Sequence, residues 1–556
     1  MDAGITLSKE ARTLLEEAVD HLEAAYDKTA CLISEEYQGQ RFPSLRNSMY
    51  YVLGLLILGR PDAGETTDAV CRKVLSFQMD APNEVWHGAF RHPDAPVPPH
   101  GLFDWRTVSL SERYRADVTW ERIQGSFDRR LREDARFSGQ AEQIEAVLHQ
   151  ALLEQVPVAW DTYEPNIREF IGMCIAMLLQ HFNGMLSDDL TASLKASARL
   201  LMDGAIARSE SGFTPLNTNI RIMYVFLLDW FGRCLQETAW QEKAQTEALR
   251  LLSDYRAYHA CAEFNSPTYC GVDLATLGFW RRYGSETLKS AGAELEQGIW
   301  EDMAAFYNPE MRNFCGPYSR CYELDMRIHT CFYDLLYLGL GEARFPLHPF
   351  SIEGVMRPLT VLGDVAIPSS LSEAFTGPCQ TRFVTRRFRE LSERGDPQNN
   401  HALCTASAWI TPALMYGAMS GSENPSYQLH PFVLFWRHND RLGTVSLHRR
   451  LPDGTMNHLR TVLFDGTVSQ NRANLEVRNR TTRTVEVFFR LECPGLQPEQ
   501  LKPESWLLPG LHVDFSASGP RSRLVRHPDG TCELCWLLEP EDVLRFHLVP
   551  ELQEAH

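Results

Sequence analysis

The spacing of hydrophobic positions changes near residue 350. Before that point, apolar residues recur every three to four positions, which is typical of helices with a buried face. After it, short runs rich in β-branched and aromatic residues are divided by turn signals such as Asn439-Asp440, Pro452-Asp453-Gly454, Asp465-Gly466 and Pro528-Asp529-Gly530. The expected helices cover residues 11–25, 48–58, 141–153, 168–182, 190–202, 220–235, 244–261, 274–283, 288–306 and 326–338. The expected strands cover residues 381–388, 432–437, 444–450, 459–464, 474–477, 484–491, 511–516, 523–527 and 533–538.

Helices that precede strands, rather than alternating with them, predict a helical domain joined to an antiparallel β domain. Polar segments precede several of the apolar helices at intervals of 46 to 55 residues, around Asn166, Asn219, Asn265 and Arg320. This period fits repeated helix pairs, each with an outer amphipathic helix and an inner helix that is apolar on all sides. We therefore expect an α+β multidomain protein. An N-terminal (α/α) toroid of helix hairpins would cover residues 1–345, and a C-terminal antiparallel β-sandwich would cover residues 346–556.

The inner helices of such a toroid start at one common mouth. Helix N-termini carry partial positive charge and free N–H groups, which suit a carboxylate or phosphate ligand. Asn, Ser and Asp are also favoured helix caps, so capping alone could explain any single Asn. Capping does not require a Tyr or Arg beside each cap, and this favours a shared cleft. The candidate residues at these helix starts are Asn166, Asn217, Asn219, Arg221, Glu263, Asn265, Tyr269, Tyr318, Arg320, Tyr322 and Asp325.

This arrangement resembles the toroid-fold polysaccharide lyases, especially the heparinase II/III and alginate-oligosaccharide lyase types. The resemblance implies a catalytic Asn about fifty residues before a catalytic Tyr, which here are Asn219 (or Asn217) and Tyr269. In the chondroitin AC lyase-like toroids an Arg follows the Tyr at a similar interval, and Arg320 occupies that place. Heparinase-type members also supply a His from the start of the β domain, and His401 is positioned to be that residue.

The implied reaction removes the C5 proton of a uronate and expels the sugar linked at O4. Asn amides (Asn219 or Asn217, and Asn265) and the Arg320 guanidinium would stabilise the charge that moves onto the carboxylate. Tyr269 would be the base or the acid, with Arg320 and a desolvated, positive mouth lowering its pKa. The partner of Tyr269 would be His401 or Tyr318. The substrate-binding residues would be Asn217, Asn265, Arg221, Tyr322, Asn166, Glu263 and Asp325.

Other classes of protein stay open at this point. A glycoside hydrolase on the same toroid would need two carboxyl groups that flank the bond. The acids available for that pair are Glu263, Asp273, Glu323, Asp325, Asp161 and Glu164. A dehydratase or isomerase of a small metabolite is a further alternative, as is a carbohydrate-binding protein without activity. A lyase leaves an unsaturated uronate that absorbs in the ultraviolet, whereas a hydrolase leaves only a new reducing sugar.

The composition and net charge limit the classes of partner that we expect the protein to bind. The net charge of −18 over 556 residues argues against binding to nucleic acid or to an anionic membrane surface. We expect an oligosaccharide or small acidic substrate, a possible homo-oligomer, and neither a cofactor nor a metal. The 14 cysteines are scattered along the chain, and we expect them to be reduced thiols. Cys532 and Cys535 form one CxxC pair. The N-terminus lacks a leader-like pattern, so the expected location is cytoplasmic, or secreted if a leader has been removed.

Overall fold

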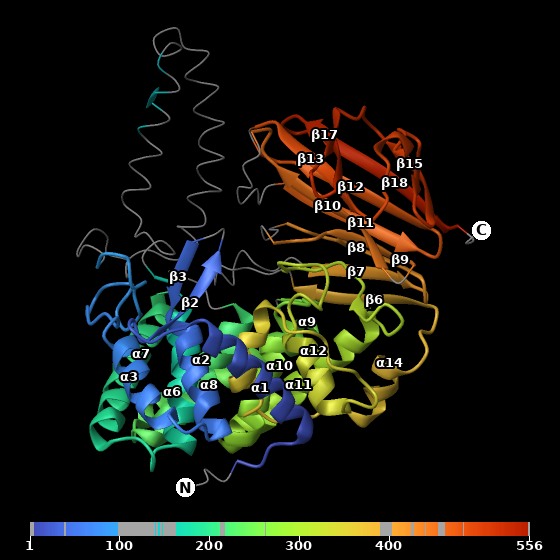
Figure 1. Ribbon diagram of the computed structural model, residues 1–556. Helices are drawn as coiled ribbons and strands as arrows, with labels where there is room; N and C mark the ends of the chain where they lie inside the picture. The colour runs from blue at the N-terminus through green and yellow to red at the C-terminus, as the bar shows by residue number, and fades with distance from the viewer. Residues whose placement is uncertain are drawn as a thin grey trace.

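The computed structural model of the chain has a helical half and a β half (Figure 1). It describes residues 5–37, 40–97, 140, 143–144, 147, 163–211, 217–261, 263–389, 403–423, 428–439, 441–453, 462–481 and 483–553. Across these ranges, no helix is both long enough and apolar enough to cross a bilayer.

Ten long helices in the described ranges form the helical half. Five of them are inner helices that are buried along most of their length, because their residues are apolar on nearly all sides. They are α2 (Leu45–Leu58), α6 (Ile167–His181), α8 (Thr218–Cys234), α10 (Cys270–Tyr283) and α12 (Cys331–Leu340). The other five bury a single stripe and lie outside: α1 (Lys9–Ala24), α3 (Ala63–Leu75), α7 (Asp188–Ser211), α9 (Thr238–Tyr258) and α11 (Glu286–Phe306).

The inner helices pack against one another in chain order, from α2 through α6, α8 and α10 to α12. Each of the first four is followed directly by the outer helix that packs on it, so all inner helices run in the same direction. This arrangement confirms the predicted toroid of helix hairpins. The gap between α12 and α2 is filled by the 3-10 helix η1 (Ile352–Met356) and by α13 (Arg357–Thr360), which pack on α1 and α2. The division of the chain at residue 345 stays a prediction.

Two details of the helical half differ from the predicted elements. The helix expected over 326–338 begins only at Cys331, because Asp325 organises a turn before it by accepting the Arg327 N–H at 2.9 Å. Helix α3 was not predicted, since its polar residues obscure the stripe formed by Val70, Cys71 and Val74. The helix expected over 141–153 lies almost entirely outside the described residues.

The β half is a sandwich of two antiparallel sheets, as predicted. Aromatic side chains from both sheets meet in its core, where Phe489 contacts Trp506, Phe515 and Phe546. The eight-stranded sheet has the order β16 (Arg523–Arg526), β17 (Cys532–Leu538), β13 (Val485–Glu492), β10 (Arg441–Arg450), β9 (Phe432–His438), β8 (Leu414–Ser420), β7 (Leu403–Ile410) and β6 (Arg382–Arg389). The five-stranded sheet has the order β11 (Val462–Ser469), β12 (Arg472–Asn479), β18 (Val543–Leu552), β15 (Leu511–Ala517) and β14 (Ser505–Leu508).

Of the four turn signals, three were right and one was wrong; at one of the three, Pro452 and Asp453 form a turn after β10. Asn439, with φ +48°, ends β9 before the chain returns in β10, and Gly530, with φ +90°, lies in the turn between β16 and β17. Asp465 and Gly466 lie instead in the middle of β11. A Cβ on Gly466 would lie 2.8 Å from the Ala418 Cβ atom of the other sheet, so this glycine permits close packing of the two sheets.

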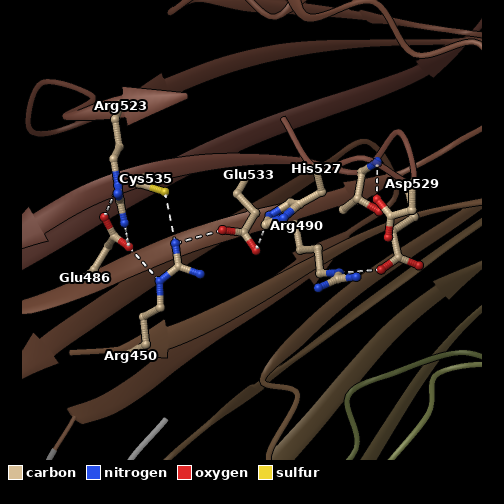
Figure 2. Close-up of polar contacts among 10 residues, drawn as sticks. Arg450, Glu486, Arg490, Arg523, His527, Asp529, Glu533 and Cys535 are labelled. Carbon is tan, nitrogen blue, oxygen red and sulfur yellow. Dashed lines mark hydrogen bonds and ion pairs between the residues drawn. The ribbon is translucent and has the colours of Figure 1, made fainter. Parts of the chain in front are cut away.

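A network of ion pairs lies on the face of the eight-stranded sheet that is turned away from the sandwich core (Figure 2). The guanidinium of Arg450 contacts Glu486 and Glu533, each at 2.7 Å, and Glu486 also accepts two hydrogen bonds from Arg523. Cys535 lies beside Arg450 on this face, at 3.7 Å. Cys532 is three residues away on the same strand and therefore points to the opposite face, which excludes a metal or disulfide shared by this pair.

Helix α11 and strand β6 are joined by Asp302, which accepts a hydrogen bond from Arg386 at 3.1 Å. Burial outweighs the effect of Arg386 and raises the pKa of Asp302 from 3.8 to about 7. Between pH 3.8 and about pH 7, Asp302 is ionised in the unfolded chain but still protonated in the folded protein. The free energy of unfolding therefore falls as pH rises through this range. Asp302→Asn removes the titrating group, so we expect the fall in the free energy of unfolding over this pH range to be smaller by up to about 4 kcal/mol. Urea unfolding at several pH values checks this, and equal slopes for both proteins would contradict it.

Candidate active site at the mouth of the helical ring

The start of α10 and the segment before α12 contact the β half, and together they form the mouth of the ring. The loop from Cys315 to Cys321 lies at the centre of this region. Its Ser319 N–H donates to the carbonyl of Phe264, just before α10, and its Tyr318 exchanges two backbone hydrogen bonds with His430 of the β half. The loop is therefore held from both sides.

Asn265 fixes this loop from the start of α10. Its backbone is left-handed, with φ +53°, a conformation that Asn tolerates better than most residues. Its Nδ2 donates to the carbonyls of Cys315 and Pro317, at 2.7 and 3.0 Å. The structure thus places Asn265 at the mouth, where its amide nitrogen holds the backbone that carries Arg320.

The predicted Asn, Tyr and Arg come together in one cluster. The Arg320 Nη1 donates to Glu263 Oε1 at 2.6 Å, and its guanidinium carbon lies 4.4 Å from the centre of the Tyr269 ring. The second oxygen of Glu263 accepts the Asn219 backbone N–H at 3.0 Å. Asn219, Tyr269 and Arg320 are 5%, 7% and 8% exposed, so the cluster is nearly but not completely covered.

Tyr269 is held in its protonated form. Burial raises the pKa of Tyr269 well above its usual value, and the opposing effect of Arg320 is smaller. The expectation of a lowered pKa was therefore wrong, because the ring lies in the interior instead of in an open, positive mouth. The hydroxyl donates to Gln428 Oε1 at 3.0 Å. The Tyr269 hydroxyl can therefore act as a proton donor.

Oxygen atoms of three side chains in this region, Asn219, Asn265 and Asp273, lack hydrogen-bond partners among the described residues. Asn219 Oδ1 is buried without a hydrogen bond, and so are both carboxylate oxygens of Asp273, one turn into α10. Burial, with Glu263 nearby, raises the pKa of Asp273 well above its usual value, and the nearby Arg320 only partly opposes this. Asp273 is consequently a buried acid, with a raised pKa, beside an ion pair.

A cleft of about 1000 Å³ opens next to this cluster, between the helical half and the eight-stranded sheet. Tyr322 is 54% exposed and lines the cleft, and its ring contacts Tyr269 at 5.9 Å between centroids. His430 and His448 form part of the opposite wall, with their rings perpendicular at 5.3 Å. Burial lowers the pKa of His430 to about 4, so this imidazole is uncharged at neutral pH.

The remaining predicted residues have other surroundings. Tyr318 is fully buried and donates its hydroxyl to the Phe314 carbonyl at 2.6 Å. Arg221 pairs with Asp254 and Glu247 on α9, and Asn166 accepts a hydrogen bond from Arg208. Asp325 pairs with Arg327 at the cleft, where Glu323 also lies, and Asn217 occupies the N-cap position of α8 without a side-chain capping bond. His401 and Asp161 lie outside the described residues.

The prediction from sequence missed His329, Glu353 and Gln428. His329 was hidden in the helix predicted over 326–338, although it lies in the turn before α12. Glu353 and Gln428 come from distant parts of the chain, and no local signal marks either of them. Within the described ranges, no three His, Cys, Asp or Glu side chains are grouped so that they could hold a metal ion.

These observations define a class of protein: a ring of helix hairpins with a polar mouth that a β-sandwich completes. The chain belongs to the family described as a domain of unknown function, DUF8769, whose model matches residues 12–109 and 140–348. No curated protein matches the sequence.

Two solved structures show what the chain resembles in three dimensions. One is heparinase III, with 10% identity, 91% of this chain and 92% of that chain covered, and a TM-score of 0.36. The other is chondroitin AC lyase from Streptomyces coelicolor A3, with 10% identity, coverage of 98% and 83%, and a TM-score of 0.36. Both are lyases of the class that the sequence resembles. Because the identity is so low, the roles of residues in this chain are inferred from its own contacts and not from these two structures.

Proposed function

We propose that the chain is a lyase that cleaves a uronate-containing oligosaccharide by β-elimination. The observation that supports this most directly is the position of Arg320 over the Tyr269 ring, next to a cleft large enough for a sugar. A protonated phenol beside a guanidinium is suited to donate its proton, because the phenolate that forms is stabilised by the positive charge.

In this proposal Tyr269 is the acid. Elimination breaks the C4–O4 bond of the uronate, and the leaving oxygen takes the phenolic proton. The Asn219 side chain, whose Oδ1 has no partner among the described residues, and the N-termini of α8 and α10 would bind the acid group of the sugar. Glu263 would hold Arg320 and the start of α8 in place, since it bonds to both.

The test is a screen of uronate oligosaccharides for products that absorb in the ultraviolet. We expect Tyr269→Phe to lower the rate about 10²- to 10⁴-fold, the usual contribution of a positioned acid. Tyr416→Phe is a matched control, because it removes a buried hydroxyl that donates one hydrogen bond, to Ser469 at 2.8 Å within the β half. Equal rates for wild type and Tyr269→Phe would refute the role of Tyr269. New reducing ends without ultraviolet absorption would indicate a glycoside hydrolase instead.

A further inference from the structure

A histidine and a glutamate lie beside the exposed face of the cluster. His329 is 7% exposed, and its Nδ1 lies 3.3 Å from Glu353 Oε1. The imidazole stacks on Tyr322, with the ring centres 5.9 Å apart and the planes at 25°. Tyr322 also contacts Tyr269, so His329 and Tyr269 both border the same exposed ring.

Glu353 is held in its ionised form. Burial alone would raise its pKa, but the hydrogen bond with His329 and the charge of Arg46 lower it below the usual value. Arg46 lies in the first turn of α2, and its guanidinium covers the Phe170 ring at 5.0 Å. The turn before α12, through His329, and the start of α2, through the charge of Arg46, therefore both stabilise the ionised form of this carboxylate on η1.

A carboxylate at Nδ1 determines which nitrogen of the imidazole can accept a proton. The ionised Glu353 oxygen attracts the hydrogen to Nδ1, which leaves the lone pair on Nε2. Nε2 makes no hydrogen bond to any residue in the described ranges. This is the arrangement that a general base requires: one nitrogen oriented by a third group and the other not engaged by a described residue.

We propose that His329 is the base that removes the C5 proton of the sugar and that Glu353 is the residue that positions it. The inference rests on the proposed function, since it supplies the partner that Tyr269 needs. The C5–H bond breaks and its proton moves to His329 Nε2. The electron pair forms the C4=C5 bond, the C4–O4 bond breaks, and O4 takes the Tyr269 proton. Proton exchange with solvent then returns both side chains to their starting forms.

The first experiment compares His329→Ala with His259→Ala, a control histidine that is exposed at the end of α9. We expect His329→Ala to lower kcat at least about 100-fold with little change in KM, and added imidazole to restore part of the rate. His259→Ala should match the wild type. A His329→Ala rate within about threefold of wild type, measured on folded protein, would overturn the inference.

The second experiment separates the base from the acid with a 4-deoxy-4-fluoro uronoside, because fluoride leaves without a proton. Tyr269→Phe should recover most of its activity on this substrate, whereas His329→Ala should stay slow. Recovery of His329→Ala on the fluoride, with none for Tyr269→Phe, would exchange the two roles and overturn the inference. A wild-type protein that forms no unsaturated product from any uronate would refute the proposed function itself.

The role of Glu353 is tested by a pair of variants. Glu353→Gln should lower kcat by about tenfold to 100-fold at unchanged KM, as is usual when the residue that orients a histidine is lost. Glu353→Asp keeps the negative charge and should recover part of that loss. A purely structural role would lower the yield or thermal stability of both variants and leave kcat of the folded protein unchanged, and that result would overturn the positioning role.

Discussion

Replacing Arg357 with methionine is expected to lower the free energy of unfolding by about 3–5 kcal/mol. Arg357 is completely buried where α13 closes the ring of helices. Its Nε and Nη2 donate to both oxygens of Asp334 on α12, at 2.8 and 2.9 Å, and its Nη1 donates to Glu17 on α1 at 2.7 Å. Without the guanidinium, the buried Asp334 carboxylate keeps its desolvation cost but loses its partner.

Chemical denaturation followed by circular dichroism measures this change. Arg12→Met is the control, because Arg12 forms only an exposed pair with Glu16, at 3.9 Å, and exposed pairs contribute about 0–1 kcal/mol. Adding Asp334→Asn to Arg357→Met should restore part of the lost free energy of unfolding, since it removes the buried carboxylate charge that has no partner in the single variant. A loss below about 1 kcal/mol for Arg357→Met would show that Asp334 is satisfied without the arginine.

Arg450→Met is expected to have a similar effect in the β half. Glu486 and Glu533 are 1% and 2% exposed, and Arg450 lies between them (Figure 2). Burial alone would raise the pKa of Glu486, but its hydrogen bonds with Arg523 and Arg450 lower it below the usual value, so it is ionised at neutral pH. Removing Arg450 leaves Glu486 with Arg523 and Glu533 with His527, at 3.1 Å, so each buried acid loses one partner and we expect a loss of up to about 3–5 kcal/mol.

The matched control lies on the same sheet. Arg490 pairs with Glu492, and the two side chains are 38% and 48% exposed, so Arg490→Met should change the stability by less than about 1 kcal/mol. The comparison separates burial from charge, because both variants remove one arginine from neighbouring strands. Equal losses for Arg450→Met and Arg490→Met would contradict the network as the source of stability.

The inner helices could be predicted from sequence because their burial is nearly complete. Residues from Ile167 to Leu179 are all buried in α6, and those from Phe170 to Leu179 form a long apolar run that is typical of a central helix. Element boundaries were less accurate. The start of α12 depends on hydrogen bonds to Asp325, and Gly466 lies inside a strand because of Ala418 in the other sheet. Neither cause is visible in the local pattern.

The cluster of Asn219, Tyr269 and Arg320 was predicted from the repeat, since equivalent positions of successive hairpins meet at one mouth. The repeat could not reveal how deeply they lie, and burial reversed the expected direction of the Tyr269 pKa. It also could not reveal His329 and Glu353, because their contact joins two segments outside the repeated pattern. Predicting such a pair requires the three-dimensional arrangement of the ring closure.

The loop that carries Arg320 is held in place by residues that lie more than a hundred positions later in the sequence. Tyr318 pairs with His430, and the Tyr269 hydroxyl bonds to Gln428. A Cβ on Gly417 of β8 would lie 1.8 Å from the Gly316 carbonyl oxygen, so strand and loop touch through two glycines. During synthesis on the ribosome, the helices therefore emerge before the residues that hold their mouth. We expect the mouth to reach its final arrangement only after residues 428–430 have emerged and docked.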